Sequence, residues 1–192
     1  EIPMRIQSRE MGGQFSAHMW TSITAGFILG FPFILWEFWK FIKPALYDSE
    51  KKYAALFIIV ASLLFFIGVL FGYYMIAPLS VNFLANYNVS SQIFNDIDLD
   101  SYISLLRTST VASGLLFELP IIIYFLTKLG LVTPTSLRKY RKYTLVIVLI
   151  LSAIITPPDI ISQIIVAIPI MILYEISILI SVVVYNRQNK TQ

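Results

Sequence analysis

Long apolar runs separated by short charged stretches dominate the sequence, and this pattern limits what the chain can fold into. The charges that interrupt them mark five runs, at residues 15–39, 53–84, 102–127, 143–156 and 160–185. Apolar residues make up 57% of the chain, charged residues 13%, and the mean hydropathy is +0.77, whereas soluble domains carry about 25% charged residues. The pattern predicts an all-α integral membrane protein, a single transmembrane domain over 1–192 with about five transmembrane helices.

The fourth run is shorter than the others. Only sixteen uncharged residues lie between Lys142 and Asp159, which is about 24 Å of helix against about 30 Å of hydrocarbon. We expect this segment to thin the bilayer locally or to form a re-entrant arm. Together with the fifth run it should form a short hairpin whose turn is Thr156 to Asp159.

The basic residues predict which ends of the runs face the cytoplasm, because cytoplasmic loops retain Lys and Arg. Of the fourteen Lys and Arg residues, only Arg5, Arg9 and Arg107 lie on one set of ends, and the other set holds the remaining eleven. The long loop of residues 86–101 on the first side has no basic residue and carries three aspartates. We therefore predict an outside N-terminus and a cytoplasmic C-terminus, and we interpret Arg107 as an interfacial anchor.

Proline and glycine recur inside the apolar runs. Each of four runs holds one proline, which removes an i to i−4 hydrogen bond and is expected to bend its helix; these are Pro32, Pro78, Pro120 and Pro169. Two GxxxG spacings, Gly26 to Gly30 and Gly68 to Gly72, allow close helix contact, either within the chain or between two copies.

Glu118 is the most informative single residue. It stands eleven positions after Arg107 and ten before Lys128, so about 16 Å of helix separates it from each charged boundary. A carboxyl group at that depth costs about 2.5 to 3.5 kcal/mol on insertion scales, which disfavours a lipid-facing position. Two interpretations remain open: a protonated glutamate that hydrogen-bonds a neighbouring helix, or a functional polar site in a concave, partly hydrated groove.

The predicted cytoplasmic connection at residues 41–52, FIKPALYDSEKK, combines an aromatic residue, a proline and two acids, Asp48 and Glu50. Acids beside a membrane surface can receive a basic peptide, preferably through arginine. A solvated loop balanced by Lys51 and Lys52 explains the same residues.

No catalytic or metal-binding pattern emerges from the sequence. Cysteine is absent and His18 is the only histidine, so thiol catalysis and a zinc site are not expected. Nor is there a Gly-rich phosphate loop or a cluster of carboxylates. The basic residues flank apolar runs, which is typical of topology signals rather than of nucleic-acid binding. We expect no enzyme, no cofactor and no nucleic-acid partner.

Several strings of residues, taken in order, resemble the TatC family, the multispanning receptor subunit of the twin-arginine protein translocase. They are residues 41–52, FELP at 117–120, LRKYRKY at 137–143, TPPDIISQ at 156–163, AIP at 167–169 and YEI at 174–176. The resemblance implies six transmembrane helices with a cupped, concave wall and both ends in the cytoplasm. The chain begins with Glu rather than Met, and we expect that the first helix of the family lies upstream of it.

The resemblance also implies roles for individual residues. Glu50 and Phe41 match positions that bind the twin-arginine signal peptide, and Glu118 matches the acid of the concave membrane face. Thr156 and Gln163 match positions where single-span Tat partner subunits (TatA/TatB type) dock. The implied function is export of folded proteins across the cell inner (cytoplasmic) membrane, driven by the proton gradient, in a complex that contains several copies of the chain.

Two other classes of function compete with this one. A secondary transporter or ion channel would bind a proton or cation at Glu118, but further charges at that depth and matched broken helices are missing from the sequence. A membrane-anchored enzyme would need a nucleophile, a base or a metal constellation.

Overall fold

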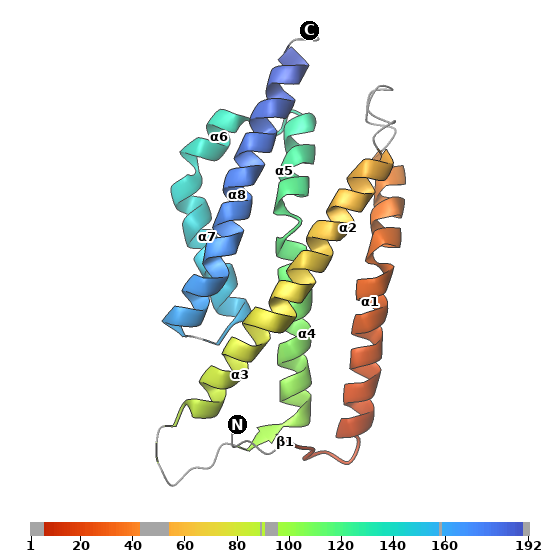
Figure 1. Ribbon diagram of the computed structural model, residues 1–192, viewed down its shortest axis with the longest axis vertical. Helices are drawn as coiled ribbons and strands as arrows, with labels where there is room; N and C mark the ends of the chain where they lie inside the picture. The colour runs from red at the N-terminus through yellow and green to blue at the C-terminus, as the bar shows by residue number, and fades with distance from the viewer. Residues whose placement is uncertain (1–5, 43–53, 89, 91–95, 158, 190–192) are drawn as a thin grey trace. The chain divides into compact units, whose positions relative to one another are not determined.

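Helices account for most of the chain in the computed structural model (Figure 1). The structure describes residues 6–42, 54–88, 90, 96–157 and 159–189. The chain divides into two compact units, Glu1–Gly114 and Leu115–Gln192.

The first unit begins with a short strand and a long helix. Strand β1 (Ile6–Gln7) pairs in parallel with β2 (Ile97–Asp98), Ile6 opposite Ile97. Helix α1 (Gly13–Ile42) follows β1, and α4 (Leu99–Leu116) follows β2 directly. As a result, α1 and α4 both start at the end of the unit where the strands pair, and they run away from it in the same direction (Figure 1).

A continuous helical segment lies between them in sequence. It consists of α2 (Ala54–Phe71), the π-helix η3 (Gly72–Ile76) and α3 (Ala77–Asn86). In η3 the Ala77 amide donates to the Gly72 carbonyl, five residues back, immediately before Pro78, which has no amide proton to donate. The wider turn thus occurs where proline interrupts the regular ladder.

The four intramembrane prolines have different consequences for their helices. Pro32 and Pro169 lie inside α1 and α8 (Ile160–Asn189), both of which remain continuous helices. Pro78 follows the π-helix, and Pro120 follows a break between α4 and α5 (Leu119–Lys128). The helical pattern therefore supports the expected disturbance at Pro78 and Pro120. It shows no interruption at Pro32 and Pro169.

Aromatic rings and glycines form the helix contacts of the first unit. Phe65 of α2 is fully buried and stacks on Phe31 of α1 with 3.5 Å between ring centroids. A Cβ atom added at Gly72 of η3 would lie 2.5 Å from the Ser109 carbonyl oxygen of α4, and one added at Gly114 of α4 would lie 2.8 Å from the Phe65 ring. Glycine is needed at both positions because no larger residue leaves room for the neighbouring helix.

The second unit consists of α5, α6 (Pro134–Lys139), α7 (Arg141–Ile155) and α8. Helix α5 ends at a turn in which Gly130 has a positive φ of 72° and donates its amide to the Thr127 carbonyl at 3.0 Å, a helix end that glycine allows without steric cost. The Thr133 hydroxyl then accepts from the Ser136 amide at 3.2 Å, and Pro134 occupies the first turn of α6, the usual start of a helix.

Helix α8 is the central element of the second unit and packs against α5, α6 and α7. Its core contacts are formed by buried side chains from three helices, namely Ile123, Leu137, Tyr174 and Ile178, with Val132 packed against them.

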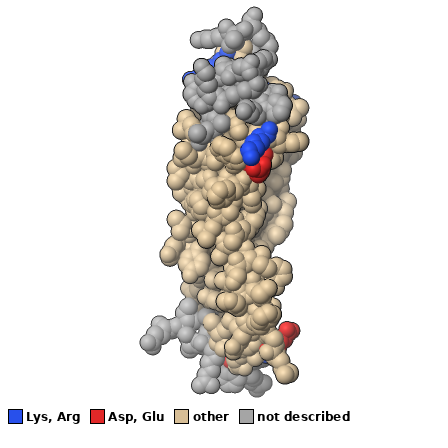
Figure 2. All heavy atoms as spheres, turned by 90° about the vertical axis from the view of Figure 1, so that its right-hand side faces the viewer, with Lys and Arg blue, Asp and Glu red and all other residues tan. Residues whose placement is uncertain are grey.

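Four helical segments are long and apolar enough to cross a membrane: Gly13–Phe41, Leu56–Asn86, Leu99–Lys128 and Ile160–Gln188. Helix α7, with 15 residues, is about 22 Å long and is not among them. On the face over α1, the charged side chains of the described residues lie near the two ends (Figure 2). The chain is an all-helical, multi-pass membrane protein; which side each end faces stays a prediction.

Candidate functional site

Glu118 lies at the interruption between α4 and α5. Its amide donates to the Leu115 carbonyl at 3.1 Å, and its own carbonyl accepts from the amides of Ile121 and Ile122, each at 3.0 Å. The regular ladder breaks here because Pro120, in the first turn of α5, cannot donate a hydrogen bond to the turn before it. The sequence Phe-Glu-Leu-Pro thus places an ionisable side chain at a break in a membrane-spanning segment.

The Glu118 side chain is buried and unsatisfied. It is only 6% exposed, and neither carboxyl oxygen has a hydrogen-bond partner among the described residues. The side chain does not cap α5 either. A buried carboxyl group without partners is costly in an apolar environment. Of the two interpretations left open by the sequence, a hydrogen bond to a neighbouring helix is not found among the described residues, and a site that receives water or a partner is consistent with the geometry.

The turn between α7 and α8 brings Thr156 and Gln163 to the same end of the hairpin. The buried Thr156 hydroxyl donates to the Ser152 carbonyl at 2.8 Å within α7. The Gln163 side-chain amide donates across to the Leu149 carbonyl of α7 at 2.7 Å. Both polar groups are therefore satisfied inside the hairpin, and their predicted contact with a partner helix stays a prediction.

Asp159 begins α8. Its Oδ2 atom accepts from the Ser162 amide at 2.9 Å and from the Ser162 hydroxyl at 2.8 Å, which is the geometry of a helix N-cap. These hydrogen bonds from the Ser162 backbone and side chain hold the pKa of Asp159 below its ordinary value of 3.8. Thr156 thus follows the last residue of α7, and Asp159 caps α8.

An ion pair joins α7 to α8 within the second unit. Arg141 donates to Glu175 Oε2 at 2.6 Å, and both side chains are about half exposed. The two residues are 34 positions apart, so their spacing in the sequence does not predict the ion pair. The sequence feature that could have predicted this ion pair is the shortness of the fourth run, because a short α7 lets its basic start lie beside the middle of α8.

The two residues matched to signal-peptide binding fall at and beyond the end of α1. Phe41 lies in the last turn of α1 with 81% of its surface exposed. Glu50 lies outside the described residues. Phe41 belongs to the first unit, whereas Glu118, Thr156 and Gln163 belong to the second.

The described residues hold no group of three or more His, Cys, Asp or Glu side chains that could bind a metal ion. What they offer is one buried carboxyl group in a membrane segment, an exposed aromatic end of α1 and a capped hairpin. These groups suit the binding of partners or peptides.

Comparison with known proteins gives one family. Residues 3–169 match the model of the family described as Sec-independent protein translocase protein (TatC). A TatC protein of Blattabacterium is 48% identical over 185 residues, covering 96% of this chain and 70% of that protein, and the TatCy protein of Bacillus subtilis is 41% identical, covering 86% and 65%. A crystal structure titled as the twin arginine translocase receptor TatC superimposes with a TM-score of 0.77 at 36% identity, covering 94% of this chain and 79% of that one. The chain thus spans about two thirds of the length of these curated relatives.

Proposed function

The chain belongs to the TatC family, and from this premise we propose that it is the receptor and core subunit of a twin-arginine translocase. In this role it recognises twin-arginine signal peptides at the cytoplasmic side and holds partner subunits while folded proteins cross the membrane. The observation that carries the proposal is the similarity along residues 3–169, together with the fold shared with a solved twin arginine translocase receptor.

Signal-peptide recognition is assigned to Glu50 and Phe41. The charge of Glu50 suits a twin-arginine motif, because a carboxylate accepts two parallel hydrogen bonds from one guanidinium group. The exposed Phe41 ring at the end of α1 offers the signal peptide an apolar contact. A charge-assisted contact of this kind contributes about 1.5 to 3 kcal/mol.

Crosslinking of a twin-arginine signal peptide to the protein in membranes tests this assignment. We expect Glu50→Ala and Glu50→Gln to weaken crosslinking while the protein stays folded and inserted. Glu37→Ala is the matched control, since Glu37 is an exposed acid near the same end of α1 and pairs with Lys40 at 2.7 Å. Undiminished crosslinking in Glu50→Ala would remove Glu50 from the receptor site.

Glu118 is assigned to a concave, partly hydrated groove in which its carboxyl group meets water or a polar group of a partner. Support comes from its burial without a hydrogen-bond partner among the described residues. Export driven by the proton gradient gives such a group a use, because protonation changes whether it accepts or donates. We expect Glu118→Gln, which keeps the hydrogen-bonding shape, to retain much of the export activity and Glu118→Leu to lose it.

Export of a folded reporter in cells tests the role of Glu118, with membrane insertion checked by protease accessibility. Normal export by Glu118→Leu contradicts the assignment. So does labelling of a cysteine at position 118 by a lipid-soluble probe but not by a water-soluble one.

Docking of single-span partner subunits is assigned to the α7–α8 turn with Thr156 and Gln163. Exposed apolar side chains surround this turn, including Ile154, Ile160 and Ile161, and a short hairpin leaves polar groups near lipid. Cysteines at positions 156 and 163 should crosslink to a single-span partner, whereas a cysteine at the buried Val148 should not. Crosslinks only to this chain's own helices would make the turn purely structural.

The remaining parts of the proposal follow from the family. We place the protein in the cell inner membrane, with the start of α1 outside and the end of α8 in the cytoplasm, and in a complex with further copies of itself. Separation of the detergent-extracted complex by mass, with a differently tagged second copy, tests the last point.

A further inference from the structure

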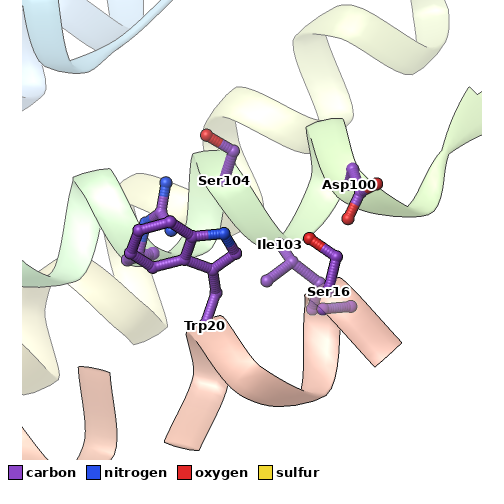
Figure 3. A pocket seen from close by; sticks show the side chains of 7 residues that line it. Ser16, Trp20, Asp100, Ile103 and Ser104 are labelled. Carbon is purple, nitrogen blue, oxygen red and sulfur yellow. The ribbon is translucent and has the colours of Figure 1, made fainter. Parts of the chain in front are cut away.

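A cavity of about 210 Å³ opens between the first turns of α1 and α4, entirely within the first unit. Helix α1 contributes Ser16, Ala17 and Trp20, and α4 contributes Asp100, Ser104 and Arg107. The Ser16 and Trp20 side chains of α1 point toward α4 (Figure 3). The volume corresponds to about seven water molecules of the liquid, which is enough for a small polar group rather than for one bare ion.

Depth along the helices places this cavity at the membrane boundary. The segment Leu99–Lys128 has 30 residues, or about 45 Å of helix, which matches a bilayer with its headgroup layers. The first few residues of α4, with Asp100, then lie at headgroup level. Arg107 starts about 12 Å inside, but helical side chains point back toward the N-terminus, so its guanidinium group reaches the boundary.

The guanidinium group of Arg107 is held in place by an aromatic ring rather than by a carboxylate. Its central carbon lies 4.4 Å from the centroid of the Trp20 ring. Among the residues that the structure describes, none forms an ion pair with it. A stacked guanidinium group keeps N–H donors in its plane for an oxygen ligand, and the hydroxyls of Ser16 and Ser104 line the same cavity.

Charge is ordered along the cavity with the acid outside and the base inside. Asp100 is in the first turn of α4, close to the start of α1, where its Oδ2 lies 3.5 Å from the position of a Cβ atom on Gly13. The order fits a zwitterionic headgroup whose amine extends outward from its phosphate. A headgroup with phosphate alone would leave the Asp100 carboxylate unpaired beside another anion, which is unfavourable.

We propose that this cavity is a binding site for the headgroup of an aminophospholipid of the outer leaflet. Arg107 and the two serine hydroxyls donate to the phosphate, Asp100 accepts from the primary ammonium group, and Trp20 orients Arg107. The acyl chains then run along the apolar surface of α1, of which Ile23 and Phe27 are exposed. The choice of the outer leaflet rests on the proposed orientation, with the start of α1 outside, whereas the site itself depends on the membrane location of the chain and not on its function as a receptor.

Lipid titration of the purified, delipidated protein in detergent tests the site, with bound lipid counted by native mass spectrometry and the thermal unfolding midpoint recorded. The probes are dioleoyl phosphatidylethanolamine, dioleoyl phosphatidylcholine, dioleoyl phosphatidylglycerol and inorganic phosphate. We expect the ethanolamine lipid to bind most tightly and to raise the midpoint most, because only its ammonium group carries N–H donors for Asp100.

Variants separate the two ends of the site. Arg107→Gln should lower the affinity for the ethanolamine lipid about tenfold or more. Asp100→Asn should erase the preference for ethanolamine over glycerol headgroups. Arg138→Gln, at an exposed arginine of α6, is the matched control and should bind like the wild type. If Arg107→Gln does not fold, Arg107→Lys carries the test, since it keeps the charge but loses the planar, stacked donor and should also bind more weakly.

Three results overturn the proposal. They are equal affinity of wild type and both Arg107 variants for the ethanolamine lipid, a wild type that binds the glycerol lipid as tightly as the ethanolamine lipid, and full displacement of lipid by inorganic phosphate. The last result would make a free anion the ligand of the cavity.

Discussion

In the first unit, α1, α2 and α4 meet through stacked rings and glycines, whereas in the second unit side-chain hydrogen bonds join α8 to its neighbours. The stack of Phe31 on Phe65 and the close approach of Gly72 to α4 represent the first kind. The Thr127 hydroxyl donating to Ser181 at 2.8 Å represents the second.

The buried hydroxyl groups show the same contrast. In the first unit the buried serines Ser62, Ser80, Ser109 and Ser113 have no hydrogen-bond partner among the described residues. In the second unit the buried Ser152 hydroxyl also has no partner among the described residues, but the buried Tyr174 hydroxyl donates to the Leu137 carbonyl at 2.9 Å. The Gln188 side-chain amide there donates to the Lys128 carbonyl at 2.9 Å.

Lipid chains are as apolar as the helices, so apolar contact alone does not favour helix association. Helix association in the first unit therefore depends on shape complementarity, because small residues and flat rings let the helices approach closely. The second depends on hydrogen bonds that fix the rotation of α8 about its axis. Substitutions that alter volume should damage the first unit most, and substitutions that remove single polar atoms should be measurable mainly in the second.

The largest effect is expected for Phe65→Ala. Phe65 is fully buried and contacts Phe31, Phe27 and the backbone region of Gly114. Its truncation leaves a cavity and should lower the free energy of unfolding by about 3 kcal/mol. This is the low end of the losses measured for Phe→Ala substitutions, because the side chain of the unfolded protein in detergent still has an apolar environment. Thermal unfolding in detergent measures this. Phe33→Ala, at a ring that is 76% exposed, should change stability little, and equal losses in the two variants would contradict ring packing as the main contact.

Gly72→Ala comes next. The new methyl group would lie 2.5 Å from the Ser109 carbonyl oxygen and 2.8 Å from the Thr110 Cα, which are backbone atoms that cannot turn away. We expect a loss of about 2 kcal/mol from the resulting displacement of α4. In Gly26→Ala, where nothing lies within 4 Å, alanine should be neutral or stabilising. The same unfolding assay applied to both variants decides whether close approach, rather than helix propensity, explains the glycine.

Tyr174→Phe tests the polar contacts of the second unit. It removes the hydroxyl group that donates to the Leu137 carbonyl and keeps the buried ring. The expected loss is about 1 kcal/mol, that of one hydrogen bond. Hydrogen exchange of the α6 amides should rise as well. A variant as stable as the wild type would mean that the ring alone holds α6 against α8.

A smaller effect is expected from the pair Thr127 and Ser181, whose hydroxyl groups are both buried. The double-mutant cycle of Thr127→Val and Ser181→Ala isolates their interaction, which should amount to about 0.6 kcal/mol, the average for hydrogen bonds between membrane helices. An interaction energy of zero would show that the unfolded reference state finds equally good partners.

The smallest effect concerns pH. The pKa of Asp159 lies below its ordinary value because the Ser162 amide and hydroxyl donate to the carboxylate. The stabilisation is therefore complete above the ordinary value of 3.8 and is lost as the pH falls through the lowered pKa. Unfolding midpoints recorded down to about pH 3 should fall less steeply in Asp159→Asn than in the wild type. Parallel curves would show that the cap does not contribute.

The sequence alone anticipated several local features because their causes are local. A proline without an amide proton predicts a disturbed ladder, and the π-helix before Pro78 and the break before Pro120 agree with this. The shortness of the fourth run predicts a helix below spanning length, and α7 is such a helix. The depth of Glu118 between two charged boundaries predicts that its carboxyl group avoids lipid, and its side chain is buried.

The two GxxxG spacings show where sequence reasoning stops. Both have the same pattern, yet a Cβ atom at Gly72 would clash with α4, whereas Gly26 and Gly30 have nothing within 4 Å. A GxxxG spacing indicates that a neighbouring helix can approach closely. Only the positions of the other helices determine whether one does.

Apolar periodicity, proline and the placement of charges determined that this chain is a helical membrane protein, and the order of its motifs identified the family, because these properties are carried by neighbouring residues. Tertiary structure alone decided that Arg141 meets Glu175 across 34 positions, that Trp20 stacks on Arg107, and that no described side chain satisfies Glu118. Such contacts depend on the rotation and offset of whole helices, which in lipid are fixed by packing and hydrogen bonds between segments distant in the sequence.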